Sequence, residues 1–135
     1  METILITGSN GEIGSQLLSS VKKNNAKIIA FDINKPITNY KNILYIKDTI
    51  VNEKIIKKLF NNFAITQVYH FAALLSQSAI KNPQLAKQVN EEGSRLIIDS
   101  AFDSGIKNGN LVRFFFPSSI AVYGPRKLIK AKETD

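Results

Sequence analysis

Three glycines near the N-terminus have the type and spacing to bind a phosphate group. Gly8, Gly11 and Gly14 follow the apolar segment 3–7 and precede an amphipathic segment, so they lie at a predicted strand-to-helix turn. A diphosphate requires such a turn, because it binds close to the backbone at the positive end of a helix. We expect Gly8 to form the turn, Gly11 to let the ligand approach and Gly14 to let the helix pack on the strand. The alternative is a tight turn that binds no ligand.

Asp32 is the next residue whose position suggests a chemical role. It ends the predicted strand 27–32, and 32 − 14 places it 18 residues after Gly14. A carboxylate about twenty residues past such glycines accepts hydrogen bonds from a ribose diol and repels a 2′-phosphate. The sequence therefore predicts NAD as the cofactor in preference to NADP, although Lys35 nearby could accept a phosphate. A strand-end cap is the alternative role for Asp32.

The elements that position these residues follow from alternating apolar and amphipathic segments. We expect helices where apolar residues recur at helical spacing, over 13–21, over 51–63 and from Asn82-Pro83 to Gly105. We expect strands at the short apolar runs 3–7, 27–32, 43–46, 67–71 and 112–116. Strands alternating with helices predict an α/β fold, a doubly wound, Rossmann-like parallel sheet of five strands.

Composition limits the class of protein. With 135 residues, of which 44% are hydrophobic and 21% charged, the chain has the size and composition of one globular domain. No apolar run reaches about eighteen residues, which excludes a membrane-spanning helix and predicts no membrane partner. Cysteine is absent, which excludes disulfides, thiolate metal sites and a cysteine nucleophile and agrees with a location in the cytoplasm. We expect no metal site.

The net charge of +7 comes from basic residues that are mostly scattered along the predicted helices. No stripe of interleaved basic and aromatic residues accompanies the charge, so we expect no nucleic-acid partner. The one dense basic run begins at Arg126 and Lys127. We therefore divide the chain into an NAD-binding domain over 1–125 and a solvated basic tail over 126–135.

Further motifs occur along the chain in an order typical of one family. They are the glycine loop 7–14, Asp32, Asp48, His70-Phe71-Ala72-Ala73, Asn90 and Ser118-Ser119-Ile120-Ala121-Val122-Tyr123-Gly124-Pro125. On these residues the chain resembles the extended short-chain dehydrogenase/reductases, the NAD-dependent epimerase/dehydratase family. Within that family, segments 74–90 and 117–125 are similar to short-chain L-threonine 3-dehydrogenases, and nucleotide-sugar epimerases share the same skeleton.

The resemblance implies a cofactor-binding role for residues spread along the chain. Asp48 would bond the adenine amino group, with Ile33 and Thr49 beside the adenine. Small residues within 71–74 would let the backbone pass close to the cofactor's riboses, and Asn90 would reach a loop near the cofactor. Ordinary packing of the small residues and a solvent-facing Asn90 are the alternatives. The full predicted set is Gly8, Asn10, Gly11, Glu12, Ile13, Gly14, Asp32, Ile33, Asp48, Thr49, Phe71, Ala72, Ala73, Leu74, Asn90 and Ser118.

The resemblance also implies a residue for the chemistry itself. Ser119 follows the fifth predicted strand, at the edge of the sheet where ligands bind. It would hydrogen-bond the substrate oxygen that gains or loses a proton; Ser118 is the alternative residue, and a loop cap is the alternative role. His70, the sole histidine, is predicted to be a packed structural residue because it lies within a strand.

The family's catalytic base is a tyrosine with a lysine four residues later on one helix. The match here, Tyr123 with Lys127, is rejected because Gly124 and Pro125 would break that helix. We therefore expect a chain truncated before the substrate region and inactive alone. Its full-length parent would oxidise a small molecule, L-threonine, to 2-amino-3-oxobutyrate with hydride transfer to NAD. With the missing half present, the resemblance allows a homodimer. The alternatives are a fragment of a nucleotide-sugar epimerase or dehydratase and a non-catalytic NAD-binding module.

Overall fold

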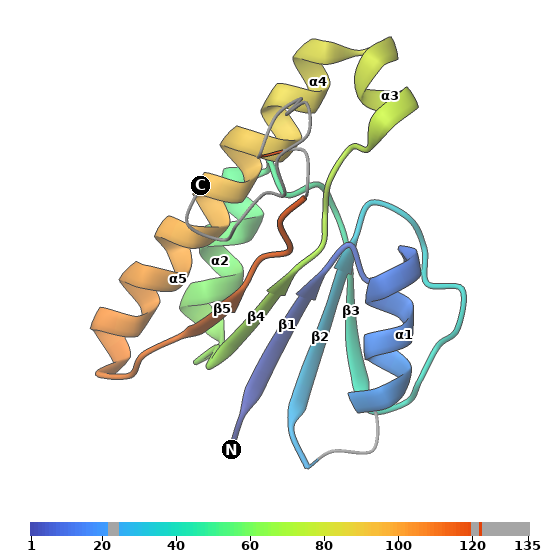
Figure 1. Ribbon diagram of the computed structural model, residues 1–135. Coiled ribbons are helices and arrows are strands. Elements are labelled where there is room, and N and C mark those ends of the chain that lie inside the picture. The colour runs from blue at the N-terminus through green and yellow to red at the C-terminus, as the bar shows by residue number, and fades with distance from the viewer. Residues whose placement is uncertain (22–24, 120–121, 123–135) are drawn as a thin grey trace, which may run out of the picture.

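A five-stranded parallel sheet forms the centre of the protein, seen in a computed structural model that describes residues 1–21, 25–119 and 122. The strand order is β3-β2-β1-β4-β5, and every neighbouring pair is parallel (Figure 1). The strands are β1 (Thr3–Thr7), β2 (Lys27–Asp32), β3 (Ile43–Lys47), β4 (Gln67–His70) and β5 (Arg113–Phe115). This order confirms the predicted doubly wound α/β fold.

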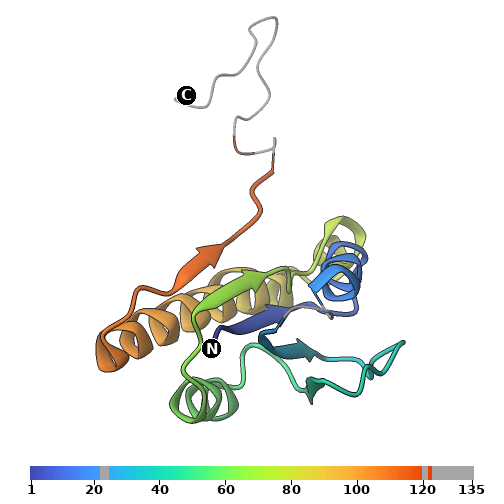
Figure 2. The same cartoon turned by 90° about the horizontal axis from the view of Figure 1, so that it is seen from below.

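Helices cover both faces of the sheet. The first, α1 (Glu12–Val21), lies on one face, and α2 (Glu53–Asn62) and α5 (Ser94–Asn108) lie on the other (Figure 2). The remaining helical segments join β4 to α5 and are α3 (Ser76–Lys81), α4 (Pro83–Lys87) and the π-helical turn η1 (Gln88–Gly93). None of the helices in the described part of the chain is long and apolar enough to cross a membrane.

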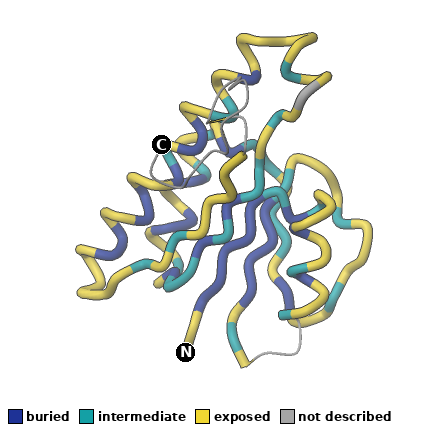
Figure 3. Tube along the Cα trace, in the orientation of Figure 1, coloured by how far each residue is buried: buried dark blue, intermediate teal, exposed yellow. Residues whose placement is uncertain are grey.

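The core consists of two apolar layers, because successive side chains of a strand point to opposite faces. Leu5 and Ile29 pack with α2 and α5, whereas Ile4 and Ile28 pack with α1. The central strands are therefore buried on both sides, as Figure 3 shows for β1 and β2. This packing explains why β1 and β2 are nearly continuous apolar runs in the sequence.

The last helical region differs from the prediction. Asn82 does cap a helix, since its side chain accepts a hydrogen bond from Leu85 N at 3.1 Å. The predicted single helix is instead α4, η1 and α5 in succession, and α3 precedes them without having been predicted. Gly105 does not stop the helix: it is buried inside α5, which ends at Gly109 with φ of 66°.

Smaller differences concern the boundaries. The fourth strand ends at His70 and the fifth spans only Arg113–Phe115, each shorter than predicted. Ile13, predicted on the apolar face of the first helix, is 59% exposed because it lies in the first turn, at the edge of the sheet. The predicted basic tail over 126–135 lies outside the described residues.

Three substitutions at two glycines test where the last helix ends. A Cβ on Gly105 would lie 2.7 Å from the carbonyl oxygen of Asn110, so Gly105→Ala should lower the free energy of unfolding by about 1–3 kcal/mol. Gly109 has open space but a left-handed backbone, so Gly109→Ala should cost about 1 kcal/mol and Gly109→Asn less. Urea denaturation of the three variants measures these changes. A stabilising Gly105→Ala would show that the close contact does not exist.

Candidate cofactor site

The segments that leave the carboxyl ends of the strands meet at one edge of the sheet (Figure 1). In the register of the sheet, Thr7 pairs with Phe31 on one side and with His70 on the other. The next residues, Gly8, Asp32 and Phe71, therefore emerge side by side. Ligands of doubly wound sheets bind at this edge, so the topology brings the predicted glycine loop and the predicted acidic residue together.

The glycine loop has the backbone geometry that was predicted for it. Gly8 has φ of 66°, and a Cβ there would lie 2.7 Å from the backbone nitrogen of Ala72. A Cβ on Gly14 would collide with the carbonyl oxygen of Gly8, so α1 packs directly on the turn. Gly11 is exposed and its N–H donates to the Gly8 carbonyl at 3.0 Å. The loop is thus open to solvent at Gly11 and closed on its protein side.

The start of α1 supplies hydrogen-bond donors at this edge. The hydrogen bonding of the helix begins with Ser15 N, which donates to the carbonyl oxygen of Gly11 at 2.9 Å. The amide groups of the first turn of an α-helix have no carbonyl partner within the helix, and the helix dipole makes this end positive. An anionic diphosphate therefore fits the segment 11–14.

Asp32 is held in place by two backbone donors. Its Oδ2 accepts from Asn10 N at 2.9 Å and its Oδ1 accepts from Asn34 N at 2.9 Å. The side chain is half-buried, and each carboxylate oxygen keeps a further lone pair. The carboxylate does act as a cap at the strand end, and it still has acceptor capacity for a ribose diol.

Asp48 lies on the other side of β2, just after β3. Its N–H donates to the carbonyl oxygen of Asp32 at 3.0 Å, and its Oδ1 accepts from Thr49 N at 2.8 Å and from Asn52 Nδ2 at 3.0 Å. Asn52 also caps α2, because its Oδ1 accepts from Ile55 N at 3.4 Å. The sequence analysis missed this role of Asn52, although an Asn at the start of a helix was a visible signal.

The segment after β4 is fixed from both ends. Ala72 N donates to the hydroxyl oxygen of Thr7 at 3.3 Å. Leu74 exchanges two hydrogen bonds with the side chain of Asn90: Leu74 N donates to Oδ1 at 2.8 Å, and Nδ2 donates to the Leu74 carbonyl at 2.9 Å. Asn90 lies in η1 and is not solvent-facing, so this alternative is wrong. Its role in cofactor binding stays a prediction.

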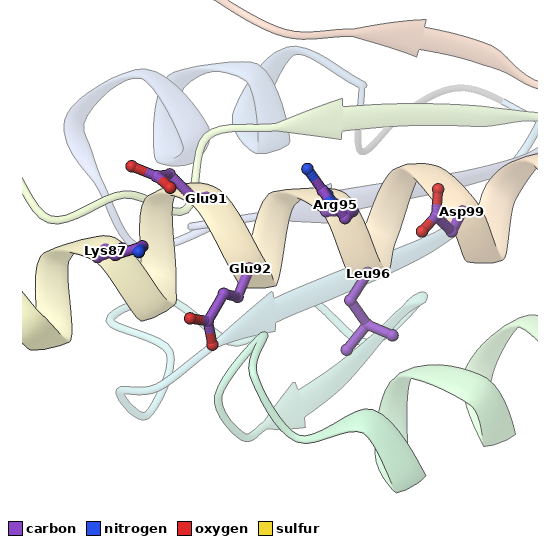
Figure 4. Close-up of a pocket in the computed structure, with 6 residues that line it drawn as sticks. All are labelled: Lys87, Glu91, Glu92, Arg95, Leu96 and Asp99. Atoms are coloured by element: carbon purple, nitrogen blue, oxygen red, sulfur yellow. The ribbon is translucent and has the colours of Figure 1, made fainter.

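Two surface hollows differ in their relation to this edge. One lies between the glycine loop, the end of β2 and β3, and Asn10, Asp32 and Lys35 are among its lining residues. The other runs along one helical stretch, as Figure 4 shows, and is lined by Lys87, Glu91, Glu92, Arg95, Leu96 and Asp99. None of the predicted site residues lines the second hollow, so the first is the relevant one.

Comparison with known proteins identifies the family. The NAD dependent epimerase/dehydratase family matches the chain over residues 4–135. The chain belongs to this family. The match confirms the expected family and its cofactor, NAD.

Several members of the epimerase/dehydratase family are similar to this chain. The mitochondrial L-threonine 3-dehydrogenase of Bos taurus is 33% identical over 127 residues, which are 92% of this chain and 32% of the relative. A solved monomeric L-threonine 3-dehydrogenase from a metagenome database is 35% identical, with a TM-score of 0.72 over 90% of this chain and 38% of the other. The UDP-glucose 4-epimerase of Thermotoga maritima, solved with UDP-glucose, is 25% identical, with a TM-score of 0.71 over 76% and 35%. The chain thus spans about a third of the length of the curated dehydrogenase.

The residues predicted for catalysis in this family lie at the far end of the described chain. Ser118 and Ser119 are exposed and follow β5, whose carboxyl end reaches the same edge of the sheet. The carbonyl oxygen of Ser119 accepts from Val122 N at 3.1 Å. Tyr123 and Lys127, the rejected pair, lie outside the described residues. The catalytic role of Ser119 stays a prediction.

His70 is a structural residue, as predicted. It is 1% exposed; its Nδ1 lies 2.6 Å from Thr7 Oγ1 and its Nε2 lies 2.9 Å from Ser94 Oγ. The ring also stacks on Phe116, with 5.5 Å between the ring centroids. Burial lowers the pKa of His70 to about 4, so the imidazole is neutral near pH 7 and links β1, β4 and α5.

This pKa predicts that the chain loses stability in acid. An unfolded histidine, with a pKa of about 6.5, takes up a proton as the pH falls, whereas native His70 does so only near a pKa of about 4. The contribution of His70 to the free energy of unfolding is therefore complete above pH 6.5. It is lost as the pH falls toward 4, by about 3 kcal/mol in total.

Proton NMR tests the prediction directly, because the chain contains one histidine. The ring C–H signal should titrate with a midpoint near 4. In urea denaturation, His70→Asn should flatten the decline in stability between pH 6.5 and 4 relative to the wild-type chain. A midpoint near 6.5, or parallel pH profiles, would show that the imidazole is not buried in this way.

Proposed function

We propose that this chain is the NAD-binding part of an oxidoreductase resembling L-threonine 3-dehydrogenase. The observation that carries the proposal is the pairing, at one edge of the sheet, of an open glycine turn with a fixed carboxylate. Gly8 closes the turn against Ala72, Gly11 faces solvent, and Asp32 is held by two backbone donors with acceptor capacity left over. The glycine turn suits a diphosphate, and the carboxylate of Asp32 suits a ribose diol.

The predicted binding residues would divide the dinucleotide among them. The backbone of Gly11, Glu12, Ile13 and Gly14 would hold the diphosphate at the positive end of α1. Asp32 and Asn10 would lie at the adenosine ribose. Asp48 would bond the adenine, with Ile33 and Thr49 beside it. The remaining predicted contacts, from Phe71, Ala72, Ala73, Leu74, Asn90 and Ser118, lie toward β4 and β5 and would surround the other half of the cofactor.

The side chains around Asp48 support its role toward adenine. Asn52 Nδ2 and Thr49 N both donate to Oδ1 of Asp48, and among the described residues none donates to Oδ2. The carboxylate is thus fixed in one orientation with one oxygen open to an amino group. Ile33 is 61% exposed, so its apolar surface is available to a base. An exposed isoleucine beside an oriented carboxylate is an arrangement that a purine would cover.

The proposed reaction of the full-length parent is the oxidation of the side-chain hydroxyl of L-threonine. The Cβ–H bond breaks with hydride transfer to NAD, the hydroxyl proton is lost, and the carbonyl of 2-amino-3-oxobutyrate forms. NAD supplies the hydride acceptor when bound. Ser119 would hydrogen-bond the oxygen that loses the proton. The similarity to L-threonine 3-dehydrogenases at 33% and 35% identity supports this substrate.

In this proposal the chain binds NAD but does not catalyse the oxidation of L-threonine. Proton removal needs a base, and the Tyr123–Lys127 pair is interrupted by Gly124 and Pro125 in the sequence. A nucleotide-sugar epimerase or dehydratase fragment is the second candidate, supported by the 25% identity to a UDP-glucose 4-epimerase. A non-catalytic NAD-binding module is the third, since the described residues form the cofactor edge. The higher identity favours the dehydrogenase.

The proposal also includes an oligomeric state and a cellular location. A homodimer of the full-length parent remains a prediction. The cytoplasmic location also remains a prediction, and the bovine relative is named as mitochondrial.

Isothermal titration calorimetry tests the central claim. The chain should bind NAD more tightly than NADP, because the carboxylate of Asp32 accepts from a free diol and repels a phosphate. Asp32→Ala removes hydrogen bonds to a charged group worth about 1.5–3 kcal/mol, so it should weaken NAD binding by about 10- to 150-fold. Asp99→Ala, an exposed substitution on α5, is the matched control and should bind NAD as the wild-type chain does. A wild-type chain that binds neither nucleotide would refute the proposed function.

An activity assay tests the second claim. The chain incubated with L-threonine and NAD should produce no NADH absorbance above a sample without protein, because Gly124 and Pro125 interrupt the Tyr123–Lys127 pair in the sequence. The purified chain must first be shown by calorimetry to bind NAD, so that absence of turnover is not absence of cofactor. Accumulation of NADH would contradict the claim and would direct attention to Tyr123.

A further inference from the structure

Asn10 joins the glycine loop to the connection that follows β2. Its side-chain Nδ2 donates to the carbonyl oxygens of Asn34 at 3.0 Å and of Lys35 at 2.9 Å. Its backbone N–H donates to Asp32 Oδ2 at 2.9 Å, and Asp32 Oδ1 accepts from Asn34 N at 2.9 Å. These four hydrogen bonds form a closed ring, which we call the Asn10 tie, consisting of Asn10, Asp32, Asn34 and Lys35.

In the Asn10 tie, N–H groups beside the proposed position of the adenosine ribose already donate to protein acceptors. The amide of Asn10 gives both its hydrogens to carbonyl oxygens, and the backbone N–H groups of Asn10 and Asn34 are given to Asp32. Those N–H groups have no further hydrogen to offer, whereas the carboxylate of Asp32 and the carbonyls of Asn34 and Lys35 keep acceptor capacity. A ribose diol, which brings two O–H donors, matches this set, and a 2′-phosphate, which brings only acceptors at its ester oxygens, does not.

The charges near the tie would otherwise favour a phosphate. The hollow beside it is lined by Lys35 and Lys47 as well as by Asp32. Two ammonium groups beside one carboxylate leave a local excess of positive charge, which would attract a 2′-phosphate. The tie fixes the backbone of one of these lysines, because the Lys35 carbonyl is bonded to Asn10. The position of the Lys35 side chain thus depends on a residue of the glycine loop.

We propose that Asn10 is a positioning residue that sets the preference for NAD over NADP. It keeps the connection after β2 in a conformation that presents acceptors to the ribose and holds Lys35 in place. The inference rests on the proposed function, since it takes NAD binding as given. Asn10 acts through Asp32 and Lys35 and has no part in the chemistry of the reaction.

Calorimetry of Asn10→Ala with NAD and with NADP tests the proposal. The variant keeps the backbone bond from residue 10 to Asp32 and loses the two side-chain bonds. The two lost bonds are exposed and restrain only the connection after β2, so the ratio of NAD to NADP affinity should fall by at most about 30-fold. The double variant Asn10→Ala/Lys35→Ala should recover much of the ratio, because it removes the cation that the tie restrains.

Asn39→Ala is the matched control for the calorimetry. Asn39 is an exposed asparagine of the same connection and lies outside the tie, so its removal should leave the ratio unchanged. An Asn10→Ala variant that binds NAD and NADP with the wild-type ratio overturns the proposal, whether or not both affinities fall. An equal loss for both nucleotides would assign Asn10 a structural role only.

Amide exchange measured by NMR tests the tie without any ligand. The N–H of Asn34 should exchange faster in Asn10→Ala than in the wild-type chain and in Asn39→Ala, because the connection is released. Unchanged exchange overturns the tie, even if the variant binds nucleotides poorly. If the wild-type chain binds neither nucleotide, the proposed function fails, and the specificity role fails with it; faster exchange of Asn34 would then still support the tie itself.

Discussion

The close approach of Gly8 to the segment after β4 is the contact on which the cofactor edge depends. A Cβ at position 8 would lie 2.7 Å from the backbone nitrogen of Ala72, a distance that real side chains do not reach. The same Ala72 N–H donates to the Thr7 hydroxyl, so the end of β1 is bonded to this segment as well as pressed against it. Because these contacts hold the turn against the segment after β4, the start of α1 lies at the edge, where the amides of its first turn have no carbonyl partner within the helix.

A buried polar network connects β1, β4 and α5 beneath that edge. Thr7 and Ser94 flank the imidazole of His70, which has no other way to satisfy both ring nitrogens out of contact with water. Leaving such a group unpaired costs about 1–3 kcal/mol, so the three side chains specify one relative position of β1, β4 and α5. Asn90, one turn before Ser94, fixes Leu74 in the same way. Asn90 lies within the π-helical turn η1 and Ser94 directly follows it, and π-helical turns occur frequently at functional sites.

The two ends of this edge differ in the hydrogen-bonding groups that they offer. At the start of α1 the groups without partners are N–H donors, which suit an anion. Around β2 and β3 the nearby backbone N–H groups and Asn52 Nδ2 donate to Asp32 and Asp48, and these carboxylates keep acceptor capacity beside the ammonium groups of Lys35 and Lys47. A dinucleotide has the same sequence of chemistry, with an anionic diphosphate followed by a ribose diol and an amino group. The groups along this edge and the groups of a dinucleotide match in the same order. This match is the physical reason for assigning the edge to NAD.

The sequence by itself determined the order of the five strands, the parallel sheet, the glycine loop and the position of Asp32. These features depend on local patterns, since apolar runs, helical periodicity and glycine turns involve residues that are close together in the chain. Only the tertiary structure decided that Gly109 and not Gly105 ends α5, because Gly105 is buried within the helix and Gly109 adopts the left-handed conformation. It likewise decided the partners of Asn90 and Asn10, which lie 16 and up to 25 residues away in sequence. An asparagine carries two donors and an acceptor wherever it stands, and the fold alone determines which backbone groups they meet.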